Sequence, residues 1–190
     1  MEQNEIDDWK HRLLVNAHVK LLTRPKSISE LDVEVPFSSY GLRGVIDILV
    51  KSPECMRIIE VKPRLINLNE AIRQLKTAKT YYKSSYPYNN NLYLCKDYFR
   101  LEIVTFCSTE NIKIIMDNLE TILVANIMVY FYKVDKLTNE CKYVPVVAGG
   151  NMPDFDNNLE EVEKYKKWVL NQITIYLFDL KELKKELINE

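Results

Sequence analysis

The chain has 190 residues, of which 47% are hydrophobic and 28% are charged, and its formal net charge is −1. This balance predicts a globular protein with one sizeable core. A charge so close to zero excludes a general attraction to nucleic acid, so any such contact must come from a local patch. No apolar run approaches the length of a membrane span, and the acidic, polar start does not fit a signal peptide, so we expect an intracellular, cytoplasmic protein.

The cysteines are spaced too widely for a zinc knuckle or a clustered iron–sulfur site. They are Cys55, Cys95, Cys107 and Cys141, and no two of them form a Cys-x-x-Cys pair. Because intracellular thiols are kept reduced, the sequence predicts free cysteines.

The first predicted element is a helix over residues 5–22, where apolar residues recur at helical spacing until Arg24-Pro25 ends the run. It carries both histidines of the chain, His11 and His18, seven residues apart and therefore roughly on one side of the helix. Each histidine is either a ligand in a site or an ordinary surface or core residue.

A strand is predicted over residues 31–37, with Glu34 on one face and apolar side chains on the other. Pro36 lacks an N–H, which favours a position at the edge of a sheet or at a strand end. Glu34 is then either a solvent-facing residue or a support for a site on the next strand.

Two short β-branched runs, residues 44–50 and 57–61, predict buried strands. Asp47 lies inside the first run, Glu60 lies inside the second, and Lys62 follows two residues later. Charges in core strands are costly unless they are paired or bound to a metal. Side chains alternate along a strand, so Glu60 and Lys62 share one face. A short connection makes the two strands a hairpin that can place Asp47 beside Glu60. The pattern indicates a divalent-metal site with an adjacent general base.

After Pro63 the pattern predicts a helix that Asn67 caps, with Glu70 at the capping-box position. Gln74 borders the apolar stripe of this helix, where its side chain can reach the mouth of the site. The helix also carries four cations that form either a solvated face or a set of phosphate contacts, namely Arg73, Lys76, Lys79 and Lys83.

The next part of the chain predicts further strands at residues 92–95 and 101–106 and a helix over residues 109–126 that Ser108 or Thr109 caps. A hairpin of strands over residues 128–134 and 143–147 follows. Together these elements predict an α/β fold with a mixed central sheet flanked by helices.

Gly149-Gly150 marks a joint, so we divide the chain into a domain over residues 1–150 and a helical extension over residues 151–190. From Leu159 to Leu187 apolar residues recur mostly at three- and four-residue steps, over about four heptads that Lys166 interrupts. We expect this long C-terminal helix either to pack on its own domain or to form a homo-oligomer, a dimer or higher.

Gly44-Val45-Ile46-Asp47, then Glu60-Val61-Lys62, then Gln74 on the following helix resembles the signature of the PD-(D/E)XK nuclease superfamily. More narrowly, the set is similar to the RecB-like branch, whose motifs run Gly-x-x-Asp, Glu-x-Lys and a helical Gln. The resemblance covers roughly Asp32 to Tyr98. This chain departs from the pattern twice, because Ala78 stands where the branch often has Tyr and Ile46 replaces the proline that names the superfamily.

The resemblance implies a restriction-endonuclease-like core of order αβββαβ and the hydrolysis of DNA phosphodiester bonds in replication, recombination or repair. It implies that Mg²⁺ or Mn²⁺ is held by Asp47, Glu60 and the Val61 carbonyl, with Lys62 and Gln74 acting in catalysis. In relatives a helix ahead of the sheet completes the metal shell. For this role we take His18, with Glu5 and His11 as alternatives, and Glu34 as a supporting residue.

Two other functions remain open on the same core. A Holliday-junction resolvase is one, although Gln74 on its helix favours the RecB-like branch. The other is a nuclease-fold module that binds DNA or a protein and does not cut. The intact set of Asp47, Glu60 and Lys62 argues against such a module, because binding alone needs no costly charges at these three positions.

Overall fold

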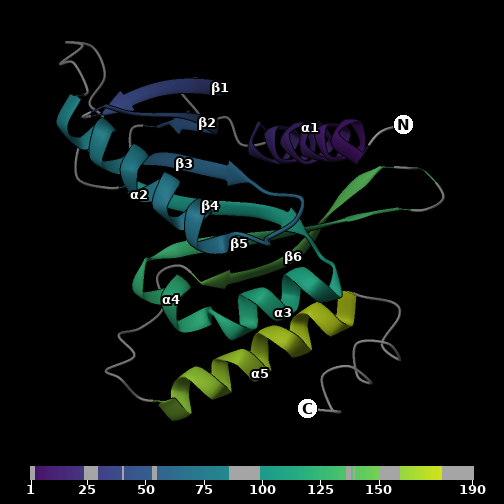
Figure 1. The fold of residues 1–190 in the computed structure, drawn as a ribbon. Helices are drawn as coiled ribbons and strands as arrows, with labels where there is room; N and C mark the ends of the chain where they lie inside the picture. Colours follow the sequence, from purple (N-terminus) through teal and green to yellow (C-terminus); the bar gives the residue numbers. More distant parts are fainter. Residues whose placement is uncertain are drawn as a thin grey trace.

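A computed structural model describes residues 3–23, 30–39, 41–52, 55–85, 99–135, 138, 140–149 and 159–176 of the chain. Figure 1 shows a twisted sheet between helices. The elements are α1 (Gln3–Leu22), β1 (Glu30–Ser39), β2 (Leu42–Lys51), β3 (Met56–Val61), α2 (Leu68–Ser85), β4 (Phe99–Phe106), α3 (Thr109–Asp117), α4 (Leu119–Val124), β5 (Ile127–Val134), β6 (Cys141–Gly149) and α5 (Leu159–Tyr176). The strand expected at residues 92–95 lies outside the described residues.

The six strands form one mixed sheet in the order β1-β2-β3-β4-β5-β6. The pairs β1–β2, β2–β3 and β5–β6 are antiparallel, whereas β3–β4 and β4–β5 are parallel. Parallel neighbours need a crossover connection, and α2 supplies the first while α3 and α4 supply the second. The predicted mixed α/β sheet flanked by helices is confirmed, as are the edge position of β1 and the hairpin of β2 and β3.

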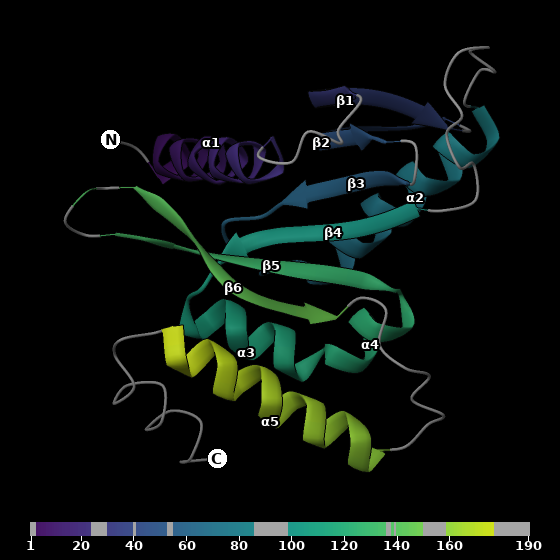
Figure 2. The ribbon, with the colours of Figure 1, turned by 180° about the vertical axis from the view of Figure 1, so that it is seen from behind.

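The sheet has a separate apolar core on each face. On one face α2, α3, α4 and α5 pack against Ile58, Ile103 and Phe131. On the other face α1 covers Ile59, Val104 and other side chains of the central strands. Figures 1 and 2 show α2 and α1 on opposite sides of the sheet. Ile58 and Ile59 are neighbours in sequence yet belong to different cores, as the alternation of side chains along a strand requires.

The helix predicted over residues 109–126 is divided at Asn118 into α3 and α4. Ser108 is the N-cap, since its hydroxyl accepts a hydrogen bond from the Asn111 N–H. At the break the Asn118 side chain donates to the Ile114 carbonyl at 2.8 Å. An asparagine that bonds the preceding backbone in this way competes with helix continuation, which explains the division.

The apolar residues that recur from Leu159 to Leu187 form a C-terminal stripe, and its described part, on α5, packs on the protein's own domain. Val169 and Ile173 of α5 are fully buried in the core on the α2 side of the sheet. The Tyr165 hydroxyl accepts a hydrogen bond from the Gly149 N–H at 3.1 Å, which holds α5 to the end of β6. Residues 177–190 lie outside the described residues. A homo-oligomer contact through this stripe stays a prediction, and Val169 and Ile173 are not available to it.

Gly44, the first residue of the Gly-x-x-Asp motif, lies under the ring of Phe37. The two residues are partners across β1 and β2, and a Cβ at position 44 would meet two ring atoms of Phe37 at 2.6 Å. Phe37 is only 7% exposed, so its ring has little room to move aside. The motif glycine therefore serves close packing of an aromatic ring across the strand pair.

Gly44→Ala is expected to lower the free energy of unfolding by about 1–3 kcal/mol, the usual effect of forcing extra volume into a packed core. Urea unfolding of the wild type and the variant measures this change. The double variant Gly44→Ala/Phe37→Leu should lose less than the two single changes together, because the smaller side chain makes room for the methyl group. Equal stability of Gly44→Ala and the wild type would refute the close contact.

Within the described ranges, no helix combines the length and the apolar character that crossing a membrane requires.

Candidate functional site

The candidate site lies where β2 and β3 separate. Their antiparallel pairing ends at Ile48 and Ile59. One residue further along, the carboxylate of Asp47 accepts a hydrogen bond from the Val61 N–H at 2.6 Å. A side chain thus replaces a backbone carbonyl as the partner of β3, and Asp47 is held next to Glu60 as the hairpin predicted.

Glu60 and Lys62 form a close ion pair beside this carboxylate. Lys62 Nζ lies 2.6 Å from Glu60 Oε1, and the Glu60 side chain is 5% exposed whereas that of Lys62 is 35% exposed. Ile59 and Val61, on either side of Glu60, both belong to the core under α1. Because side chains alternate, Glu60 faces the α2 side of the sheet. The Lys62 N–H donates to the Val104 carbonyl at 2.9 Å, which holds the end of β3 to β4.

His11 of α1 completes the group. Its Nε2 lies 3.1 Å from Asp47 Oδ1, and the two side chains are 27% and 13% exposed. The hydrogen bond with Asp47 raises the pKa of His11, although partial burial acts in the opposite direction. The structure therefore brings together His11, Asp47, Glu60 and Lys62.

His18, the ligand predicted from sequence, does not lie in this group. It lies seven residues after His11, about 10 Å further along the helix axis. Its side chain is fully buried, and its Nδ1 lies 2.8 Å from the Tyr132 hydroxyl. The sequence did hold the signal that separates the two histidines. His18 has leucines four residues away on both sides, Leu14 and Leu22, and so belongs to the buried stripe of α1.

Around His18 the structure has a second polar cluster that the sequence analysis missed. The Arg57 guanidinium donates two hydrogen bonds to Glu102, at 2.7 and 2.8 Å, and Glu102 is fully buried. His18 Nε2 lies 3.7 Å from Glu102, beyond hydrogen-bond distance, and has no partner. Burial lowers the pKa of His18 and would raise that of Glu102, but the neighbouring His18 and Arg57 lower the pKa of Glu102. This cluster joins α1 to β3, β4 and β5.

Glu34, the predicted supporting residue, is exposed and makes no hydrogen bond or ion pair with Asp47, Glu60 or Lys62 among the described residues. The register pairs Val33 with Ile48 and Val35 with Ile46, so Glu34 falls opposite the position of Asp47. Its φ of 53° is in the left-handed region, which an L-residue rarely adopts in a strand. The β1–β2 register continues unchanged on both sides of Glu34, so the unusual backbone conformation is confined to this residue.

The charge of Glu60 is unfavourable in this position. Burial, followed by the negative charge of Asp47, raises the pKa of Glu60 to about 7, and the Lys62 ammonium only partly offsets this. Two carboxylates that repel each other at the end of a buried strand favour a bound cation.

Glu60 is expected to make the stability of the metal-free protein depend on pH. The folded protein keeps the Glu60 proton up to about pH 7, whereas the unfolded chain releases it near the ordinary value of 4.5. Between these values the unfolded state binds fewer protons, so stability decreases as pH rises. Urea unfolding in EDTA across this range should show the decrease in the wild type and a smaller one in Glu60→Gln. If the free energies of unfolding of the wild type and Glu60→Gln differ by the same amount at every pH in this range, the raised pKa of Glu60 would be contradicted.

Gln74 has a buried side-chain oxygen, Oε1, without a hydrogen-bond partner in the structure. Its neighbours on the same face of α2, Ala71 and Ala78, are both buried, so Gln74 lies on the side of the helix that packs on the sheet. Buried amide oxygens are rarely left unbonded, and such an atom calls for a ligand or an ordered water.

The four predicted phosphate-binding cations lie along α2, where Arg73, Lys76 and Lys83 are exposed and Lys79 is half-buried. The Arg73 guanidinium pairs with Glu70 at 2.6 Å. Arg73 and Lys76 line a hollow of about 350 Å³ together with Asn69, Ile72, Thr77 and Thr80. The cations therefore form one side of the helix beside a surface depression.

The groups that could hold a divalent cation are the carboxylates of Asp47 and Glu60, the carbonyl of Val61 and the imidazole of His11. This set fits Mg²⁺ or Mn²⁺, which prefer carboxylate and carbonyl oxygens. No three His, Cys, Asp or Glu side chains of the described residues are grouped as a ready metal site. Asp47 and Glu60 instead pair with His11 and Lys62, so a metal ion would exchange these contacts.

The described cysteines, Cys55, Cys107 and Cys141, are free thiols, as predicted. Burial raises the pKa of Cys107 and of Cys141 to about 12, so these two are unsuited to act as nucleophiles.

No family model, no curated protein and no solved structure matches this chain. The resemblance to the RecB-like nucleases therefore rests on the ordered motifs and on the geometry of the residues that carry them.

Proposed function

We propose that this protein is a metal-dependent nuclease of the RecB-like type, with a restriction-endonuclease-like core, that hydrolyses DNA phosphodiester bonds. The proposal depends mainly on the side-by-side placement of Asp47 and Glu60 where β2 and β3 separate, with Lys62 paired to Glu60. Phosphodiester hydrolysis builds negative charge on the phosphate oxygens and needs an activated water. Two carboxylates and a lysine at one strand end supply the groups that this reaction uses.

Asp47, Glu60 and the Val61 carbonyl would hold Mg²⁺ or Mn²⁺, which stabilises the developing charge and lowers the pKa of a bound water. Asp47 also fixes the backbone of Val61 through its second oxygen, so the carbonyl and the carboxylate are positioned together. The other oxygen of Asp47 contacts the His11 imidazole, and a bound metal would replace this contact and have His11 beside it as a further ligand.

Lys62 reaches from the buried Glu60 toward solvent, since 35% of its side chain is exposed. Its ammonium can contact a phosphate oxygen or orient the attacking water at the mouth of the site. The unbonded Oε1 of Gln74 is a further acceptor that can position a water by hydrogen bonding.

One observation favours a second candidate, a module with the same fold that binds DNA without cutting it. Asp47 and Glu60 each have a cationic or imidazole partner within the described residues, so their charges are partly compensated without a metal. A protein that has lost catalysis can keep such pairs as structural contacts.

A cleavage assay separates the two candidates. Single-stranded, duplex, nicked and four-way DNA are incubated with Mg²⁺, with Mn²⁺ or with EDTA. A nuclease should cut at least one of these substrates with a divalent metal and none with EDTA. Metal-independent binding with no cleavage of any substrate would favour the binding module, and preference for the four-way substrate would favour a junction resolvase.

The α2 cations are expected to contact phosphates of the bound DNA. Replacing Lys76 and Lys83 with Ala should weaken binding and flatten the dependence of log affinity on log salt by about one per lost contact. Fluorescence anisotropy at several salt concentrations measures the slope. The matched control replaces Lys164 and Lys167, which are exposed on α5. An unchanged slope in the α2 variant would leave these residues as a solvated helix face.

A further inference from the structure

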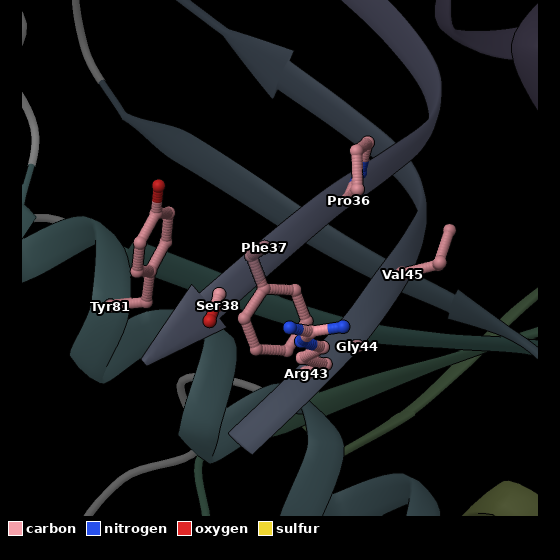
Figure 3. A pocket seen from close by; sticks show the side chains of 7 residues that line it. All are labelled: Pro36, Phe37, Ser38, Arg43, Gly44, Val45 and Tyr81. Carbon is pink, nitrogen blue, oxygen red and sulfur yellow. The ribbon is translucent and has the colours of Figure 1, made fainter. Parts of the chain in front are cut away.

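A pocket of about 600 Å³ lies between α2 and the paired ends of β1 and β2. It is lined by Pro36, Phe37, Ser38, Arg43, Gly44, Val45 and Tyr81. Figure 3 shows Tyr81 extending from α2, whereas Phe37 and Arg43 extend from the two neighbouring strands. We call this space the aromatic pocket.

The aromatic rings of the pocket are held in place by their neighbours. The ring centroids of Phe37 and Tyr81 lie 5.9 Å apart with a tilt of 40°. Phe37 is fixed by Gly44, which leaves room for its ring, and Tyr81 packs edge-on against the buried Tyr82 at 5.0 Å. The two rings are tilted to each other and Phe37 is buried, so the partly exposed ring of Tyr81 offers the apolar face, and its packing lowers the entropic cost of binding.

Among the described residues that line the pocket, Arg43 is the one side chain that carries a charge, so this lining is positive. A partly exposed aromatic ring beside a guanidinium suits a ligand that joins a planar ring to an anion. A nucleotide has this chemistry, since its base stacks on aromatic rings and its phosphate pairs with arginine.

The pocket is also close to the candidate site along β2. Val45 lines the pocket and Asp47 follows two residues later, about 7 Å along the strand. This distance corresponds to about two stacked nucleotides. Phe37 and Tyr81 pack with the core on the α2 side of the sheet, which is the side that Glu60 faces.

We propose that the aromatic pocket receives a base of the substrate strand next to the bond that is cut, so that the enzyme acts on unpaired DNA. The inference rests on the proposed nuclease function and adds its substrate class. Bases in a duplex present no free face for stacking, whereas a single strand or a frayed end does. Arg43 contacts a phosphate of the same strand.

Binding in EDTA tests this pocket without cleavage. The probes are a labelled oligothymidylate and a strand of equal length in which the bases are replaced by abasic sites, and affinity is measured by anisotropy. Tyr81→Ala should weaken binding of the oligothymidylate by about 5- to 100-fold, the range for loss of one base stack. It should leave binding of the abasic strand unchanged, and Tyr81→Phe should stay within about twofold of the wild type.

The comparison of the two strands separates lost stacking from lost folding, because a misfolded variant binds both strands less well. The matched control is Trp168→Ala, which removes an exposed aromatic ring from α5. If Tyr81→Ala loses affinity equally for the oligothymidylate and the abasic strand, or for neither, the proposed role of the pocket in binding a base would be overturned. Thymidine monophosphate that competes for the pocket as well as the oligothymidylate does would show that the pocket binds a free nucleotide. That result would overturn the proposal that it receives a base of a DNA strand.

Cleavage of the oligothymidylate with Mn²⁺ is measured on the same proteins. Normal cleavage with no effect of Tyr81→Ala on binding would overturn the pocket and leave the nuclease function intact. A wild type that neither binds nor cuts any strand would overturn both.

Discussion

Asp47→Asn and Glu60→Gln are each expected to reduce metal-dependent DNA cleavage by at least about a thousandfold. The reason is that the proposed metal, held by the carboxylates of Asp47 and Glu60, would supply several kcal/mol of charge stabilisation in the transition state. Both changes keep the shape of the side chain, and an asparagine at position 47 can still accept the Val61 N–H through its amide oxygen. Rates under single-turnover conditions with Mg²⁺ and with Mn²⁺ measure the effect.

Stability measurements separate the catalytic effect from a folding defect. At pH 8 Glu60→Gln should be at least as stable as the wild type, because it removes a buried charge that Asp47 repels. Lys62→Ala should also abolish cleavage, but it leaves Glu60 without its cation and should lower stability. Asp117→Asn on α3 is the matched control. Full activity in folded Glu60→Gln would refute the metal site.

Arg57→Met is expected to give the largest loss of stability, about 3–5 kcal/mol. Glu102 is fully buried and receives two hydrogen bonds from Arg57, so removal of the guanidinium leaves a buried carboxylate without its counter-ion. Urea unfolding at neutral pH, with the m value checked for two-state behaviour, measures the change.

A surface pair provides the control for this prediction. Arg73→Met removes an arginine that pairs with Glu70 in an equally close geometry, but at an exposed position, and should lower stability far less than Arg57→Met does. The double variant Arg57→Met/Glu102→Gln should be less destabilised than the sum of its single changes. A loss below about 1 kcal/mol in Arg57→Met would show that the buried pair carries no net stabilisation.

The motif strands were predictable because their signal is local. A charge inside a β-branched run stands out in the sequence, and the alternation of strand side chains places Glu60 and Lys62 on one face. The short connection between β2 and β3 then fixes the register in which these two strands pair. These facts gave the position of Asp47 beside Glu60 without any knowledge of the rest of the chain.

The structure places His11 rather than His18 beside Asp47, and the leucines on both sides of His18 are the sequence signal for the burial of His18. The spacing of the two histidines places both on one side of the helix, but which turn meets the strand ends depends on how α1 lies across the sheet. The Arg57–Glu102 pair was missed because 45 residues separate its members. The sequence around Arg57 does not indicate Glu102 as its partner, and the sequence around Glu102 does not indicate Arg57. The break at Asn118 depends on a single side-chain contact with the preceding turn.

The two outer strands of the sheet each contain a proline, Pro36 in β1 and Pro145 in β6. A proline offers no N–H to an incoming strand, and the left-handed backbone conformation of Glu34 departs from regular strand geometry on the β1 edge. Neither margin of the sheet is therefore a good template for the strand of another chain. Each proline thus removes one backbone donor from an outer strand, which disfavours edge-to-edge pairing with another copy.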